Sequence, residues 1–274
     1  MAGALFSFMA MAIAGRQLSA DLTTFQILFF RSAIGLIVVV GLLLRGSRRF
    51  ASNRLGLHLL RNVAHFGGQY GWFYGLAFIP LAQVFAIEFT VPIWTALMAV
   101  PFLGERLSRP RMAAVGLGVI GLLLILRPGL DAVHPAALAV LGGAVLFAIS
   151  NIATKKLAAS EAPLTILFYM TFVQLVLSLF PAISDWILPA AWMWPWLLVV
   201  GLSALSAHYC MASAFALADA TVVVPMDFLR LPLIALVGAI FYGEPLEWLV
   251  LVGGALMLFG NWINIQAERR REAL

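Results

Sequence analysis

The amino-acid sequence predicts an all-α integral membrane protein with ten transmembrane helices, arranged as two five-helix halves. Three observations predict this fold. Hydrophobic residues make up 63% of the 274 residues and charged residues 11%, whereas soluble domains are roughly 25% charged. The mean hydropathy is +1.02. Apolar runs follow one another with brief loops between them, and the second half of the chain repeats the first at a constant distance.

A membrane-crossing helix needs about 17 to 25 mostly apolar residues. Such runs, the first and fifth of them shorter, are predicted at 2–15, 23–44, 55–79, 81–103, 112–126, 135–154, 163–183, 193–217, 220–242 and 246–266. No basic residues precede the first run, which is typical of a retained helix and not of a cleaved signal peptide. The brief loops predict that no soluble domain is appended.

The basic residues in the loops predict the orientation of the chain. Twelve lysines and arginines gather on one side of the predicted membrane, and only Arg16 and Arg127 lie on the other. Cytoplasmic loops carry the excess of positive charge. We therefore expect both termini in the cytoplasm, in the cytoplasmic membrane of a bacterium.

The two halves are related by one constant distance along the chain, the distance from Phe8 to Phe147, which we call the repeat distance. Other identical pairs at the repeat distance are Ile27-Leu28-Phe29 with Ile166-Leu167-Phe168, Tyr70 with Tyr209, and Gly121 with Gly260. One distance that holds without gaps across five predicted helices indicates a duplication. The predicted halves are 1–130 and 131–274.

Five helices are an odd number, so the two halves must cross the membrane in opposite senses. The loop GERLSRPR at 104–111 has three arginines, while its counterpart GEPLEW at 243–248 has no basic residue. Inverted repeats of this kind suit a transporter that alternates between inward-open and outward-open forms around a central site. A membrane enzyme would need a cluster of catalytic groups, and none is visible. A channel would differ in lacking saturable exchange.

The motifs YGLAFIPLAQ at 74–83, EFTVPIWTAL at 88–97, LGERL at 103–107 and RPG at 127–129 resemble the EamA-type members of the drug/metabolite transporter superfamily. A weaker second copy carries FALAD at 215–219 and YGEPL at 242–246. The resemblance implies a ten-helix carrier that exports amino acids, other small metabolites or drugs; bacterial exporters of aromatic amino acids belong to this group. The four-helix multidrug relatives use a glutamate in their first helix, which this chain lacks.

Charged residues inside the predicted helices are candidates for gating or proton coupling. Glu88 and Asp227 are separated by the repeat distance, and each is followed by phenylalanine. An ionised side chain in a membrane span is disfavoured by roughly 2.5 to 3.5 kcal/mol, so partners are expected. Arg31 is placed to pair with Glu88, and Arg61 or Arg230 with Asp227. Salt bridges that only orient the helices remain the alternative.

Polar residues recur every three or four positions along 58–72, which places them on one side of a helix. We expect His65, Gln69 and Tyr70 to line a hydrated substrate path, with hydrogen bonding between helices as the alternative. His58 and His65 have no acidic ligand near them on this helix, so neither a metal nor a cofactor is predicted.

Further candidates for the substrate site lie near the predicted midplane: Trp94, Asn151, Tyr209 and Arg230. The aromatic rings can sandwich a flat group, and Arg230 can hold a carboxylate. Pro92 and Pro232 interrupt two predicted helices and are either hinges or static kinks.

The ionisable residues inside the predicted helices are three arginines and two acids. This balance favours an anionic or zwitterionic substrate over a lipophilic cation. The sequence thus predicts export of a small molecule, an amino acid in the first place and an aromatic or other apolar one above all. A multidrug or cation exporter is the alternative. The expected partners are the substrate and membrane lipid, with no nucleic acid.

Overall fold

The computed structural model describes residues 2–45, 52–104, 109–126, 134–218, 223, 230–245 and 247–272. Its helices are α1 (Ala2–Leu18), α2 (Thr24–Arg45), α3 (Leu55–Phe78), α4 (Leu81–Glu88), α5 (Val91–Leu103), α6 (Arg109–Leu126), α7 (Pro135–Ala158), α8 (Pro163–Ser184), α9 (Met193–Leu217), α11 (Arg230–Tyr242) and α12 (Trp248–Glu272). No strand occurs among these residues. The predicted all-helical membrane fold is confirmed.

Six segments of the described chain are long and apolar enough to cross a membrane: Thr24–Arg45, Leu81–Leu103, Pro135–Ala158, Pro163–Ser184, Met193–Leu217 and Trp248–Ala267. Shorter apolar helices cover Ala2–Leu18, Met112–Ile125 and Leu233–Tyr242. Many large apolar side chains on these helices are exposed, such as Phe180 and Ile240. An apolar surface of this extent fits a lipid environment.

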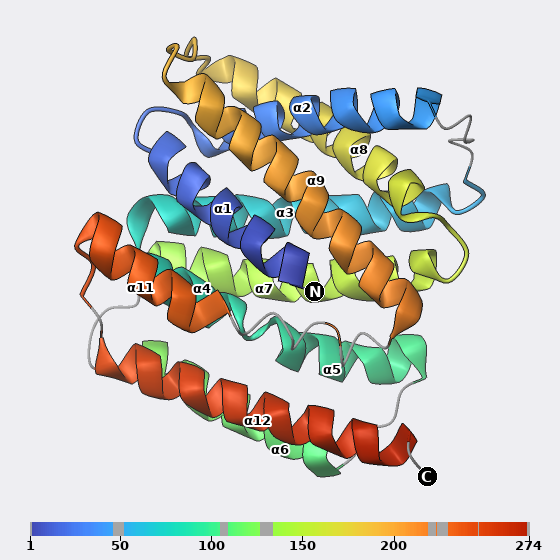
Figure 1. Cartoon of the computed structure of the whole chain (residues 1–274), viewed down its shortest axis with the longest axis vertical. Helices are drawn as coiled ribbons and strands as arrows, with labels where there is room; N and C mark the ends of the chain where they lie inside the picture. The colour runs from blue at the N-terminus through green and yellow to red at the C-terminus, as the bar shows by residue number, and fades with distance from the viewer. Residues whose placement is uncertain are drawn as a thin grey trace.

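The helices pack in pairs across the two halves of the sequence. The pairs with the most extensive contacts are α3 with α7, α6 with α12, α1 with α9, and α2 with α8. Figure 1 shows α6 and α12 side by side at one end of the long axis and α2, α8 and α9 at the other, with α3 and α7 between them. The centre of the molecule is therefore formed by both halves.

Corresponding helices begin at corresponding places. The first residues of α8, α11 and α12 follow those of α2, α5 and α6, respectively, by the repeat distance. Gly104 and Gly243, which are separated by the same distance, follow α5 and α11 with φ of 71° and 62°. This left-handed conformation is accessible to glycine without steric cost and ends a helix cleanly. In Figure 1, α2 and α8 run in opposite directions.

The fourth predicted span, 81–103, is not one continuous helix. It is divided into α4 and α5 at Phe89 and Thr90. Pro92 has no N–H to donate to the carbonyl of Glu88, so the regular helical ladder cannot continue there. Thr90 instead donates its side-chain hydroxyl to the carbonyl of Ile87 at 2.9 Å. Glu88 is thereby placed at a helix end inside an apolar segment.

The ninth predicted span, 220–242, is described mainly from Arg230 onward, where α11 begins. Asp227 lies outside the described residues. The backbone of Pro232 belongs to α11, close to its first residue. The other predicted spans match helices of the structure, with ends that differ by several residues at most.

Candidate functional site

A buried cavity lies between helices of both halves. The helices α1, α3, α4, α5, α7, α9 and α11 all contribute to its wall. Its charged and polar lining residues are Arg61, His65, Gln69, Glu88, Ser150, Asn151, Thr154, His208 and Arg230. Aromatic side chains complete the wall: Phe8, Trp72, Phe89, Phe147 and Phe215. A polar, aromatic cavity inside an apolar helix bundle can hold a small molecule away from lipid.

The polar face of α3 is directed into the protein. Arg61, His65, Gln69 and Trp72 are each less than 5% exposed, and all four line the cavity. His58, at the first turn of the same helix, contacts Glu161 with its Nε2 at 2.6 Å and is not part of the lining. Residues spaced three and four apart share one side of a helix, and lipid on that side would leave them unsatisfied.

Glu88 lies at the break between α4 and α5 and has two hydrogen-bond partners in the described part of the chain. Arg230 donates to its Oε1 at 3.2 Å, and the indole Nε1 of Trp72 donates to its Oε2 at 2.8 Å. The Arg230 guanidinium also lies over the rings of Phe8 and Phe85, at 4.6 and 5.1 Å from their centroids. The carboxylate of Glu88 therefore balances a buried arginine from the other half of the chain.

Arg31 does not pair with Glu88, contrary to the sequence-based expectation. Its NH1 donates to Gln69 Oε1 and to Gln174 Oε1, both at 2.9 Å. The physical reason is position, because Arg31 lies on α2, which packs against α8 and α9, whereas Arg230 begins α11 beside α4. Gln174 Nε2 in turn contacts His65 Nδ1 at 2.8 Å.

Arg61 is held by neutral partners. Its Nε donates to Thr154 Oγ1 at 3.2 Å, and its NH1 donates to Asn62 Oδ1 at 2.7 Å. The expected partner Asp227 lies outside the described residues, so an Arg61–Asp227 pair stays a prediction. Arg61 thus contributes a positive charge to the cavity wall.

Several predicted site residues lie elsewhere. Tyr70 stacks on Phe25, with ring centroids 4.7 Å apart, and is not among the cavity-lining residues. Trp94 donates its Nε1 to Thr90 Oγ1 at 3.2 Å, and Tyr209 is 46% exposed; neither lines the cavity. Asn151 and Pro92 do line it.

His208 and Gln174 were missed by the sequence reasoning. His208 lines the cavity, and its ring lies edge-on to that of His65, with centroids 4.6 Å apart. The sequence repeat could have identified His208, because it follows Gln69, a predicted site residue, by the repeat distance. Gln174 had no such signal, since its counterpart at this distance is Gly35.

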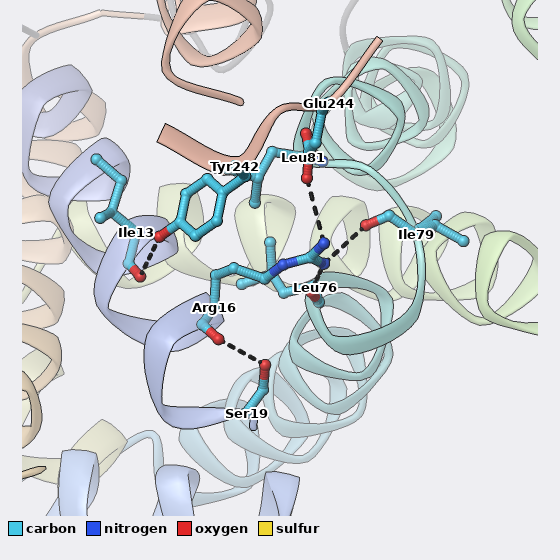
Figure 2. Close-up of polar contacts among 8 residues, drawn as sticks. All are labelled: Ile13, Arg16, Ser19, Leu76, Ile79, Leu81, Tyr242 and Glu244. Atoms are coloured by element: carbon cyan, nitrogen blue, oxygen red, sulfur yellow. Dashed lines mark hydrogen bonds and ion pairs between the residues drawn. The ribbon is translucent and has the colours of Figure 1, made fainter. Parts of the chain in front are cut away.

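A second polar cluster joins the ends of α1, α3 and α11 (Figure 2). Arg16 donates to the carbonyls of Leu76 and Ile79 and to Glu244 Oε1, the last at 3.2 Å. Glu244 Oε2 accepts the backbone N–H of Leu81 at 2.8 Å. Tyr242 lies beside them and donates to the carbonyl of Ile13 at 3.4 Å. These hydrogen bonds connect the loop after α11 to the turn between α3 and α4.

The helix bundle and its buried polar cavity define a multi-pass membrane protein with a central site for a small molecule. The profile of the EamA-like transporter family matches residues 1–127 and again residues 134–266. The chain belongs to this family, and it is a transporter of the drug/metabolite transporter superfamily. The family and its named relatives are transporters, and a transporter is not an enzyme.

Relatives of this chain are named for several different substrates. An S-adenosylmethionine uptake transporter of Rickettsia conorii is 28% identical over 97% of this chain and 91% of its own length. A riboflavin transporter of Rhizobium johnstonii is 36% identical over 78% of this chain and 72% of its own length. The pseudopaline exporter CntI of Pseudomonas aeruginosa is 30% identical over 93% and 90%.

The fold also has a solved counterpart. The crystal structure of another protein superposes on this chain with a TM-score of 0.73 over 99% of both chains, at 18% sequence identity. A likeness at this identity establishes the fold. All the named relatives above are bacterial, which makes this chain a bacterial membrane protein.

Proposed function

We propose that this protein exports an amino acid, an aromatic or other apolar one in the first place, across the cytoplasmic membrane by alternating access. The observation that carries the proposal is the composition of the cavity wall. Arginine, histidine and amide groups line the same cavity as several aromatic rings. An amino acid with an apolar side chain needs both kinds of surface.

The charge of the cavity argues against a lipophilic cation. The described lining contains Arg61 and Arg230 but only one carboxylate, Glu88, and Glu88 is already paired with Arg230. The described part of the wall thus has a net positive charge, which disfavours a cationic drug in a medium of low dielectric constant. This argument favours the amino-acid proposal over the multidrug alternative.

A second candidate is uptake of a metabolite with a flat heteroaromatic ring. The names of the Rickettsia and Rhizobium relatives, an S-adenosylmethionine uptake transporter and a riboflavin transporter, favour it. Aromatic side chains in the wall can stack on such a ring. The two candidates differ in the direction of transport and in the size of the substrate.

We further infer that residues 1–130 and 131–274 are inverted copies of one five-helix unit, with both termini in the cytoplasm. The twofold match of the family profile and the equal offsets of the helix starts support this inference. Inverted copies give a carrier two related conformations in which opposite ends of the cavity open. Glu88 and Asp227, with Arg31 and Arg61, are the proposed gating or coupling residues, and Pro92 and Pro232 the proposed hinges.

The test is a counterflow assay with the purified protein in proteoliposomes. Vesicles loaded with an unlabelled compound accumulate the same labelled compound only if a carrier exchanges the two. The compounds are phenylalanine, tryptophan, leucine, S-adenosylmethionine, riboflavin and the cationic dye ethidium. Protein-free liposomes serve as the control, and an imposed pH gradient tests for proton coupling.

We expect saturable exchange of one or more of the three amino acids. Exchange of riboflavin or S-adenosylmethionine alone would replace the first candidate with the second. Exchange of ethidium alone would refute both. Flux that ignores the pH gradient would identify facilitated diffusion and remove Glu88 as a proton-coupling residue.

A further inference from the structure

Among the residues that the structure describes, the carboxylates do not balance all the arginines in and beside the cavity. Glu88 lies 3.2 Å from Arg230 and compensates its charge. Arg61, which lines the same cavity, is bonded to the neutral side chains of Thr154 and Asn62. Arg31 is bonded to the neutral side chains of Gln69 and Gln174. Among the described residues, no carboxylate contacts either of these two arginines.

This imbalance is costly at such depth in the protein. Arg31 and Arg61 are each 3% exposed. The Nε and NH2 of Arg31 and the Nδ2 of Asn62 are buried without a hydrogen-bond partner in the described part of the chain. Buried charges are normally paired, because removing an ion from water costs several kcal/mol after relaxation. An anion bound beside Arg61 would lower that cost.

Arg31 also determines which nitrogen of His65 carries the proton. An arginine only donates, so its bond to Gln174 fixes the Oε1 of that amide as the acceptor. The Nε2 of Gln174 must then donate to His65 Nδ1. Neutral His65 consequently carries its proton on Nε2. This N–H has no acceptor among the described residues and belongs to a side chain that lines the cavity.

His208 adds a second unsatisfied nitrogen to the same wall. Its Nε2 is buried without a hydrogen-bond partner among the residues that the structure describes, and its ring lies 4.6 Å from that of His65. Arg61 has used Nε and one N–H of NH1 for its neutral partners, so NH2 remains to donate. Two donor groups of α3, on Arg61 and His65, and one unsatisfied imidazole nitrogen of His208 on α9, which donates when it carries the proton, therefore share one side of the cavity.

We propose that Arg61, His65 and His208 form a carboxylate-binding subsite for the transported substrate, with Arg31 as its positioning residue. This inference rests on the proposed transport function and names the chemical class of the substrate. A carboxylate presents two acceptor oxygens in a plane, which matches a guanidinium group and neighbouring N–H donors. The sequence suggested Arg230 as the residue that holds a carboxylate. The structure pairs Arg230 with Glu88, so we assign this role to the subsite.

Aromatic rings beside the subsite indicate which groups the rest of the substrate carries. The ring centroids of Phe147 and His65 are 5.5 Å apart, and those of Phe8 and His208 are 5.5 Å apart. A ligand anchored by its carboxylate would therefore place its next carbons between aromatic side chains. The expected substrate is an organic acid or amino acid with an apolar or aromatic group near the carboxylate.

The test compares 3-phenylpropanoate with its neutral amide, 3-phenylpropanamide, as ligands of the purified full-length protein in detergent. The readout is the shift of the thermal unfolding midpoint with ligand concentration, which reports binding to the folded state. We expect the carboxylate to stabilise the protein and the amide to have a much smaller effect. Arg61→Gln should weaken carboxylate binding about tenfold or more and leave amide binding unchanged, because it removes a charge-assisted interaction.

Arg45→Gln is the matched control, since Arg45 is exposed at the end of α2 and its loss removes the same charge outside the cavity. If Arg61→Gln does not fold, Arg61→Lys and His208→Ala carry the test, each with a severalfold loss for the carboxylate only. Equal stabilisation by the two compounds, no stabilisation by the carboxylate, or unchanged binding in the folded variants would overturn the proposal.

The outcome is separable from that of the transport assay. Carboxylate binding that needs Arg61, without counterflow of any amino acid, would refute the proposed substrate and keep the subsite. Counterflow of phenylalanine and of the amine 2-phenylethylamine at equal rates would keep transport and refute the subsite.

Discussion

Arg16 and Lys155 hold the ends of two corresponding helices in the same way. Arg16 donates to the carbonyls of Leu76 and Ile79 at the end of α3. Lys155 donates to the carbonyls of Phe215 and Ala218 at the end of α9, at 3.1 and 2.8 Å. Each member of the second set follows its counterpart in the first by the repeat distance. A cation near a helix C-terminus satisfies carbonyls that lack a helical partner.

The two contacts lie at different ends of the molecule. In Figure 1, α3 ends on the left and α9 ends on the right. An alternating-access carrier has to loosen one end while it closes the other. In the proposed alternating-access cycle, Arg16 and Lys155 would have matched roles at the two ends of the protein.

The first prediction concerns access to the cavity. Arg16→Gln should open the end where α3 finishes, and Lys155→Gln the end where α9 finishes, by roughly fivefold each, since about 1 kcal/mol changes a two-state population by that factor. The reporter is Asn151→Cys on the cavity wall, with the single native Cys210 replaced by serine. A membrane-impermeant maleimide is applied to vesicles of both orientations. We expect maleimide added from one side to label the cysteine faster in Arg16→Gln, and maleimide added from the other side to label it faster in Lys155→Gln. If both variants are labelled faster from the same side, Arg16 and Lys155 do not act at opposite ends.

The sequence predicted those parts of the fold that depend on local composition. Hydropathy was sufficient for the helices, because every lipid-exposed segment must be apolar and satisfy its own backbone. The repeat located the corresponding helices α2 and α8, and three- and four-residue spacing located the buried face of α3. The break at Phe89 and Thr90 was missed as a helix end, although Pro92 marked the place.

Side-chain partners were harder to predict, since they depend on how the helices are turned against each other. Glu88 was recognised as a candidate, but its partner proved to be Arg230 and not Arg31. Distance along a helix gives depth in the membrane and does not say which neighbour a side chain faces. For the same reason Tyr70 and Tyr209, matched by the repeat, were predicted for the cavity and lie outside its lining.

The second prediction concerns the buried pair of Glu88 and Arg230. Removing one member takes the salt-bridge partner from the other, which costs about 3 to 5 kcal/mol for fully buried pairs. Glu88 retains 14% exposure of its side chain, so the loss for Arg230→Gln should lie toward the lower end. The double variant Glu88→Gln/Arg230→Gln should lose less than the sum of the single variants. Thermal unfolding in detergent gives the stability of the parent protein, the two single variants and the double variant. Additive losses of stability would show that the two residues do not interact.

Glu88→Gln should also slow transport more than it lowers expression, because Arg230, no longer bound to Glu88, would compete with the subsite at Arg61 for a substrate carboxylate. Counterflow per amount of folded protein measures this effect. Normal flux at every pH would end the candidacy of Glu88 as a functional residue.

The third prediction concerns the pH dependence of stability at Glu244, which lies in the loop after α11. Burial raises the pKa of its carboxyl above the usual value of 4.5, and the weaker effects of the Leu81 N–H and Arg16 act in the opposite direction. The folded protein then binds the proton more tightly than the unfolded chain. The stability that Glu244 contributes is therefore fully present below about pH 4.5 and is lost as the pH rises through the pKa of the folded state.

Glu244→Gln should remove this part of the pH dependence. The midpoint of thermal unfolding, measured between acidic and neutral pH, should decline less in the variant than in the parent protein. Asp185→Asn, at an exposed position after α8, is the control and should retain the parental slope. An unchanged slope in Glu244→Gln would assign the pH dependence to other groups.

The fourth prediction uses two neighbouring glycines on α7. A Cβ at Gly143 would lie 2.9 Å from the carbonyl oxygen of Gly68 on α3, whereas a Cβ at Gly142 would meet no atom within 4 Å. Gly143→Ala should therefore push α3 and α7 apart and cost about 1 to 3 kcal/mol, as overpacking does. Gly142→Ala should be neutral or stabilising by up to about 1 kcal/mol, because alanine favours the helix. Since α3 carries Arg61 and His65, only Gly143→Ala should also weaken binding of 3-phenylpropanoate; equal unfolding midpoints for the two variants would show that α3 and α7 do not depend on this close approach.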